Sequence, residues 1–229
     1  LSGALKFVLW PSFPLKALPL PLDELAQIEM RNSNIKQLWN GIKSMNHLKI
    51  INLSNCRNFT ETTSDFSNVK SLGHLYLSRC YSLLKVHESL AVLKELVVVD
   101  LSGCEYLNSL PSKLETNSLR KLDLGWCKNV KKLPEFGEGM KKLSYLDASS
   151  TAITTLPESF GSLTGLGYLN LYSTGLINLP TDCFSGLFEL YFLSLSYCKR
   201  LESLPRLPPR LHRLEAYGCS MKCSLDEQL

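Results

Sequence analysis

Apolar residues recur along the chain in a fixed order of buried and polar positions. The unit over residues 96–111 reads LVVVDLSGCEYLNSLP, and the unit over residues 119–134 keeps its spacing. Both fit the pattern L-x-x-L-x-L-x-x-C-x-x-L-x-x-L-P. At the centre of the second unit Leu122 and Leu124 alternate with polar residues, which predicts a short β-strand. We expect the leucines to point inward and the residues between them to point outward.

The same unit repeats along most of the chain, and its period predicts the architecture. The opening position recurs in steps of 20 to 24 residues, which lies within the range of leucine-rich repeats. Thr151 and Thr174 replace the cysteine in two units. The opening residues of the ten predicted units are Leu5, Leu25, Leu48, Leu72, Leu96, Leu119, Leu143, Leu166, Leu190 and Leu211.

A single repeat cannot bury its own leucines, so the repeats must stack on one another. We therefore predict one α/β domain over residues 1–229: a curved leucine-rich-repeat solenoid, or horseshoe, and a fragment of a larger chain. Parallel strands about 4.8 Å apart would line its concave face. Turns and short helices, such as one over residues 88–96, would form the convex face.

Most of the eight cysteines fall in one column of the repeat. Their side chains would satisfy backbone groups as the chain leaves each strand. Stacked cysteines have parallel Cβ directions, which is poor disulfide geometry. We therefore expect free thiols and a reducing compartment. The pair Cys219 and Cys223 lacks the second ligand pair of a metal site. The column comprises Cys56, Cys80, Cys104, Cys127, Cys198 and Cys219.

Charge and motifs point away from several other classes of function. The net charge is +4, and the short basic runs, such as residues 128–132, read as a solvated convex face rather than a nucleic-acid site. No apolar run reaches the ~18 residues of a membrane span. Phosphate-binding, zinc-protease and nucleophile-elbow motifs do not occur. We expect no enzyme activity, no cofactor, no metal, no nucleic-acid partner and no membrane partner.

The C-x-x-L-x-x-L-P form of the repeat resembles the cytoplasmic repeats of plant immune receptors. Residues 5–19 (LKFVLWPSFPLKALP) and 25–41 (ending IKQLWNG) look like the opening of the repeat domain in TIR-type nucleotide-binding leucine-rich-repeat receptors. Residues 204–219 (LPRLPPRLHRLEAYGC) are similar to the last repeats of that family. The likeness covers nearly the whole chain, and residues 35–41 are its most specific part.

This resemblance implies a sensor in plant defence. The repeat domain would recognise a pathogen effector, or a host protein that the effector modifies, and would restrain the receptor until then. Nucleotide-binding and TIR domains would be intramolecular partners in the parent chain. The resemblance also implies a cytoplasmic location, with the nucleus as an alternative. Other readings are the substrate-selecting repeats of a bacterial ubiquitin-ligase-type effector and a generic protein-interaction scaffold. An extracellular receptor would need a G-x-I-P motif in each unit, which is missing.

The outward strand positions give a candidate partner-binding surface. Aromatic residues gather there in the sixth to tenth units, and carboxylates run beside them. Tyr and Trp dominate binding hot spots, but outward aromatics can also stack on one another across strands. The carboxylates fit a framework role as well as a binding role. The candidates are Trp126, Tyr145, Tyr168, Tyr172, Phe192, Tyr197, Tyr217, Asp100, Asp123, Asp147 and Arg213.

Overall fold

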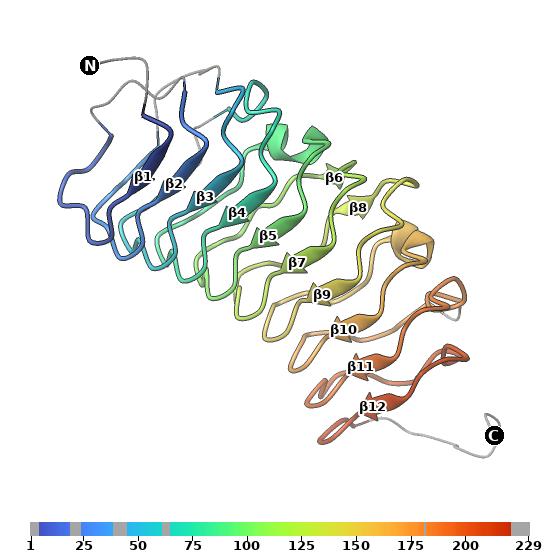
Figure 1. Cartoon of the computed structure of the whole chain (residues 1–229). Helices are drawn as coiled ribbons and strands as arrows, with labels where there is room; N and C mark the ends of the chain where they lie inside the picture. Colours follow the sequence, from blue (N-terminus) through green and yellow to red (C-terminus); the bar gives the residue numbers. More distant parts are fainter. Residues whose placement is uncertain (1–4, 19–23, 39–44, 61–64, 181, 221–229) are drawn as a thin grey trace.

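A stack of short parallel strands forms one face of the molecule (Figure 1). The computed structural model describes residues 5–18, 24–38, 45–60, 65–180 and 182–220. Neighbouring strands pair in step, so that residues at the same repeat position lie side by side, as Lys121 and Tyr145 do. The sheet has ten strands within the described ranges: β1 (Phe7–Leu9), β2 (Gln27–Glu29), β3 (Ile50–Asn52), β4 (His74–Tyr76), β5 (Val98–Asp100), β7 (Lys121–Asp123), β9 (Tyr145–Asp147), β10 (Tyr168–Asn170), β11 (Phe192–Ser194) and β12 (Arg213–Glu215).

The return segments lie behind this sheet and contain little regular structure. Within the described residues two segments form short 3-10 helices, η1 (Glu88–Val92) and η2 (Glu158–Ser162), and β6 (Lys113–Leu114) pairs with β8 (Glu135–Phe136). The arrangement confirms the predicted leucine-rich-repeat solenoid.

The helix expected over residues 88–96 is too long, because η1 ends at Val92. Its hydrogen bonds span three residues, from the Leu90 N–H to the His87 carbonyl and from the Leu93 N–H to the Leu90 carbonyl. Such tight turns seldom continue. The His87 side chain caps its start by accepting the Ser89 N–H.

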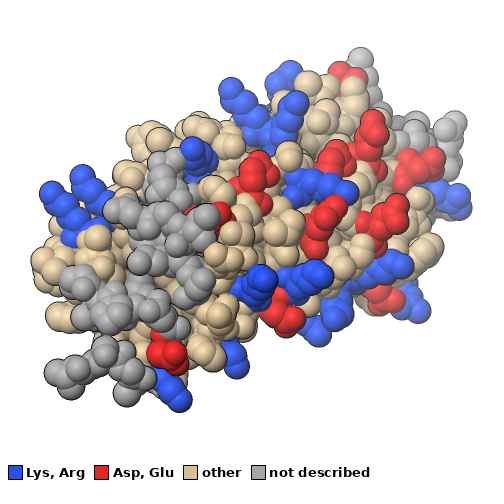
Figure 2. All heavy atoms as spheres, turned by 90° about the horizontal axis from the view of Figure 1, so that it is seen from above, with Lys and Arg blue, Asp and Glu red and all other residues tan. Residues whose placement is uncertain are grey.

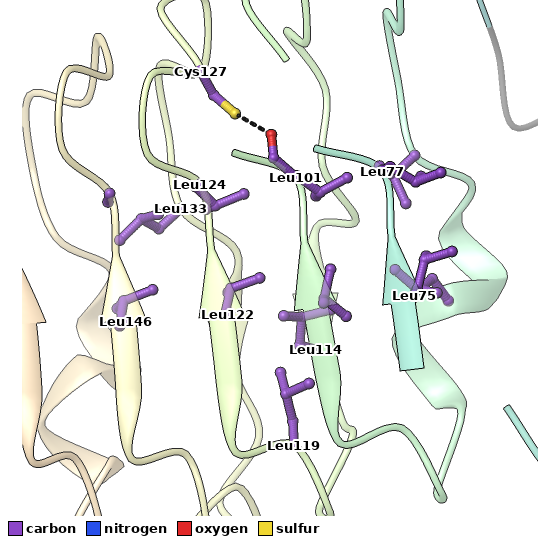
Figure 3. Close-up of a cluster of buried hydrophobic side chains, with 14 of the residues drawn as sticks. Leu75, Leu77, Leu101, Leu114, Leu119, Leu122, Leu124, Cys127, Leu133 and Leu146 are labelled. Carbon is purple, nitrogen blue, oxygen red and sulfur yellow. Dashed lines mark hydrogen bonds between the residues drawn. The ribbon is translucent and has the colours of Figure 1, made fainter. Parts of the chain in front are cut away.

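The core is a continuous column of leucines between the sheet and the return segments (Figure 3). The middle residue of each three-residue strand from β1 to β11 is buried, and Leu122 is 3% exposed. On β12, which has one neighbouring strand, Leu214 is 38% exposed. The buried residues of successive repeats form one cluster, so the core has no boundary between units.

The cysteine column forms a ladder of hydrogen bonds between repeats. The thiol of Cys127 donates to the Leu101 carbonyl at 3.1 Å (Figure 3), and the thiol of Cys104 donates to the Leu77 carbonyl at 3.1 Å. The seven cysteines in the described residues are free, as predicted, while Cys223 lies outside those residues. Burial raises the pKa of Cys104 to about 12, which disfavours the reactive thiolate.

A left-handed residue ends each strand-to-loop turn, directly before the cysteine column. Its N–H donates to the next repeat, as Trp126 does to the Ser149 carbonyl at 2.7 Å. Glycine holds two of these positions, and larger residues hold the others. Among the described residues, those with positive φ are Ser12, Asn32, Asn55, Arg79, Gly103, Trp126, Ser150, Ser173, Tyr197 and Gly218.

The outer surface carries mixed charge. On the face that Figure 2 shows, Lys and Arg side chains are interspersed with Asp and Glu. Exposed ion pairs such as Arg210 with Glu189, 3.1 Å apart, also bring opposite charges together at the surface. Such mixing is typical of a solvated face. Within the described ranges, no helix has the length and apolar character needed to cross a membrane.

Candidate protein-binding face

Three aromatic rings form a stack on the sheet face. Tyr145, Tyr168 and Phe192 are the first residues of β9, β10 and β11, and strand pairing sets them side by side. The ring centroids of Tyr145 and Tyr168 are 4.5 Å apart with an interplanar angle of 2°. Those of Tyr168 and Phe192 are 4.5 Å apart at 4°. The rings are therefore nearly parallel, one per repeat.

A cation lies at each end of this stack. The Lys121 Nζ is 4.7 Å from the Tyr145 ring centroid, and the Arg213 Cζ is 5.7 Å from the Phe192 centroid. Both distances lie within the range of cation–π attraction. We call the five side chains of Lys121, Tyr145, Tyr168, Phe192 and Arg213 the aromatic ladder. Because ring faces are covered by neighbours, the half-buried aromatic members present mainly edges and hydroxyls to solvent.

The tyrosines of the ladder keep their protons well beyond neutral pH. Burial, followed by the charges of Asp123 and Asp147, raises the pKa of Tyr145. The pKa of Tyr168 is also raised, first by burial and then by Asp147. The Tyr145 hydroxyl is hydrogen-bonded to that of Tyr168, so the Tyr168 hydroxyl is the one that keeps its proton for a partner.

The acidic column has a structural role. The Oδ1 of Asp123 accepts the Gly125 N–H at 3.2 Å, and that of Asp147 accepts the Ser149 N–H at 2.8 Å. Asp100 makes the same bond to Ser102 at 3.0 Å. Each carboxylate thus shapes the turn after its strand, and one oxygen of each is committed to it.

The remaining aromatic candidates lie outside the ladder. Tyr172 and Tyr197 form an edge-to-face pair with centroids 5.3 Å apart. Tyr217 is 72% exposed, and Trp126 is 57% exposed. Trp126 and Arg79 line one pocket. The sequence pattern did not single out Arg79. The structure therefore joins three of the aromatic candidates and Arg213 in one ladder and leaves the others beside it.

The described residues hold no group of three or more His, Cys, Asp or Glu side chains able to bind a metal.

The chain matches no protein-family model. Curated proteins do match. Disease resistance protein RPP2A of Arabidopsis thaliana is 30% identical over 215 residues, covering 93% of this chain and 14% of that protein. TMV resistance protein N of Nicotiana glutinosa is 33% identical over 212 residues, covering 92% of this chain and 18% of that protein.

The chain is a leucine-rich-repeat region of the TIR-type disease resistance proteins of plants. It spans 14% and 21% of the lengths of the relatives RPP2A and RPS4B of Arabidopsis thaliana. A solved leucine-rich-repeat protein, LIC12759 of Leptospira interrogans, aligns over 87% of this resistance-protein repeat region and 62% of its own chain, with TM-score 0.43 and 22% identity.

Proposed function

We propose that the aromatic ladder is the part of this repeat region that binds a protein ligand. In the full-length receptor that ligand is a pathogen effector, or a host protein that an effector has altered. Solenoids of this class bind proteins through extended surfaces. The observation that carries the proposal is the ladder itself, a row of aromatic edges and hydroxyls between Lys121 and Arg213.

Three properties of the ladder favour binding. Aromatic side chains bury a large area with few rotatable bonds, so ordering them costs little on association. Stacking fixes the rings of Tyr145, Tyr168 and Phe192 before any ligand arrives. The acidic column beside them, with Asp123 and Asp147, favours a partner with basic groups and would set its orientation more than its affinity.

The same repeat region would restrain the parent receptor. In this part of the proposal, it contacts the nucleotide-binding and TIR domains in the resting state, and ligand binding releases them. The parent protein would then act inside the cell, in the cytoplasm or the nucleus. The restraint is a contact between domains, so it is open to mutation separately from ligand binding.

The test uses the full-length receptor in plant leaf tissue, co-expressed with the protein to which it responds. Tyr168→Ala combined with Phe192→Ala should weaken ligand binding by at least ~2 kcal/mol, roughly 30-fold in affinity, if the ladder is a hot spot. Because the rings stack, the pair should also lower the free energy of unfolding by about 1 to 3 kcal/mol. Thermal unfolding of the repeat region measures that loss.

Two further variants separate binding from folding. Tyr76→Ala on β4 removes a ring that stacks with His74, 6.2 Å away on the same sheet, and should leave recognition intact. Tyr145→Phe with Tyr168→Phe keeps the stack and removes the two hydroxyls with the hydrogen bond between them, so it should weaken binding with a loss of stability of no more than about 1 kcal/mol. Normal recognition by the double-alanine variant would refute the ladder as the binding surface. A defence response without ligand would show that the ladder restrains the receptor.

A further inference from the structure

A pocket lies at the loop rim of the sheet, in the turns that follow β4, β5 and β7. Arg79, Gly103 and Trp126 occupy the same left-handed position in three consecutive repeats. Gly103, in the middle, has no side chain, and a gap remains between its two neighbours. This notch has a volume of about 310 Å³ and is lined by Arg79, Tyr81, Ser102, Gly103, Glu105 and Trp126.

Arg79 is the cation that the notch leaves uncommitted. Arg57 lies over the Tyr81 ring at 5.6 Å, and Lys128 pairs with Glu105 at 3.0 Å. The Arg79 guanidinium makes no ion pair or hydrogen bond with any residue that the structure describes. Its aliphatic stem lies where a Cβ on residue 103 would point, 3.2 Å from that position.

Trp126 is held in a conformation that its residue type disfavours. Its φ is 64°, in the left-handed region, which costs a non-glycine residue free energy. The side chain is 57% exposed, so little burial offsets that cost. The same turn is left-handed in the other described repeats too, so what distinguishes Trp126 is its large exposed ring, which a ligand can cover.

We propose that this notch receives a single carboxylate side chain, Glu or Asp, from a protein partner. The Arg79 guanidinium would take the carboxylate in a bidentate pair, the geometry for which its planar fork is suited. The rings of Trp126 and Tyr81 would cover the aliphatic stem of the incoming side chain. A phosphate dianion fits less well, because one uncommitted guanidinium faces it and the Glu105 carboxylate is a neighbour.

The notch is separate from the proposed function of the ladder. It lies on the loop rim and uses none of the ladder side chains. Its partner group is acidic, whereas the acidic column beside the ladder favours basic groups. A ligand that used both surfaces would have its orientation fixed by the two opposite charges. The notch can be tested alone, so its failure would leave the ladder untouched.

The experiment titrates the repeat region with a blocked pentapeptide that has one glutamate between alanines, and with its glutamine counterpart. Backbone amide NMR signals of Ser102 and Gly103 report binding in the notch. We expect a saturable shift with the glutamate peptide, and binding at least five-fold weaker with the glutamine peptide. Inorganic phosphate, the third probe, should not compete at equal ionic strength. Arg79→Gln should abolish the difference between the two peptides.

Gly103→Asn tests the shape of the notch. Asparagine holds this turn position at residues 32 and 55 with positive φ, so the variant should fold while its side chain displaces the Arg79 stem. It should lose the glutamate-specific shift, followed at Ser102. Ser150→Asn, at the same turn position in another repeat, should keep that shift. Equal shifts from both peptides, competition by phosphate, or full binding by folded Gly103→Asn would each overturn the proposal.

Discussion

At the scale of single residues, one buried hydroxyl stands out in the core. The Thr116 Oγ1 is fully buried and has no hydrogen-bond partner among the described residues. It borders a cavity of about 20 Å³ whose other lining residues, including Leu90 and Leu119, are apolar. Those walls give a water molecule none of the two to four polar partners that it needs. The hydroxyl therefore remains unsatisfied, which costs free energy in the folded state.

Thr116→Val keeps the shape of this side chain and removes the unpaired oxygen. We expect the free energy of unfolding to rise by about 1 kcal/mol, measured by urea denaturation. Thr151→Val is the matched control. The Thr151 Oγ1 donates to the Ala148 carbonyl at 2.7 Å, so its loss should lower stability by about 1 kcal/mol. If Thr116→Val were destabilising, a bound water would have to satisfy the hydroxyl.

Asp123 combines a useful hydrogen bond with an unfavourable charge. Burial, followed by the Asp100 charge, raises the pKa of Asp123. A raised folded-state pKa means that ionisation weakens the fold. Its contribution to stability is complete below the unfolded-state pKa of ~3.9 and is lost as pH rises through the folded-state value.

Asp123→Asn should therefore raise stability modestly at pH 7, and the gain should vanish near pH 3. The amide oxygen still accepts the turn N–H, as Asn52 and Asn170 do at the same repeat position. Chemical denaturation at both pH values measures the effect. Asp123→Ala, which removes that bond, should instead lose about 1 kcal/mol at pH 7. A gain for Asp123→Asn that persisted at pH 3 would contradict an electrostatic origin.

At the scale of elements, the strands followed from the sequence, whereas the return segments did not. Strand residues such as Leu122 alternate with outward ones and recur once per repeat, so pattern and period agree. The returns have no such alternation. The pairing of β6 with β8, and the early end of η1 at Val92, depend on hydrogen bonds that leave no periodic trace.

The candidate binding site could likewise be predicted from the sequence only in part. The members of the aromatic column, such as Tyr168, were visible because register places equal repeat positions side by side. The side-chain rotamers that stack them, and the approach of Lys121, are tertiary facts. The sequence pattern did not predict the notch, because the notch arises where Gly103 has no side chain between the larger residues Arg79 and Trp126.

The turn after β7 gives a prediction at this scale. Trp126→Gly removes a large side chain from a left-handed position that glycine adopts freely. The exposed ring contributes little packing, so the free energy of unfolding should rise by up to about 1 kcal/mol. Calorimetric unfolding of the repeat region provides the measurement. Phe13→Gly, which deletes a buried ring, should cost at least ~3 kcal/mol. A loss of stability from Trp126→Gly would mean that its ring packs the turn and outweighs any backbone strain at residue 126.

At the scale of the whole molecule, repeats contact mainly their neighbours, so stability passes along the stack from unit to unit. The last described unit, which contains β12, is less enclosed than the units in the middle, since Cys219 is only partly buried whereas Cys104 and Cys127 are fully buried. Local opening should therefore be easier at β12 than at β5 or β7. The thiol ladder places one reporter of such opening in most of the repeats.

Native-state thiol labelling, read by mass spectrometry, should follow this gradient. Cys219 should react first, and Cys104 and Cys127 last, because a buried thiol with a raised pKa reacts only after its repeat opens. At low denaturant concentrations, the free energy of opening measured at Cys127 should fall with denaturant nearly as steeply as the free energy of global unfolding. The free energy of opening measured at Cys219 should depend on denaturant only weakly. In strong denaturant without reductant all seven described cysteines should label, since they are free. Equal native-state rates for Cys219 and Cys127 would show that the solenoid opens as one unit, and the nearest-neighbour account of its stability would then be wrong.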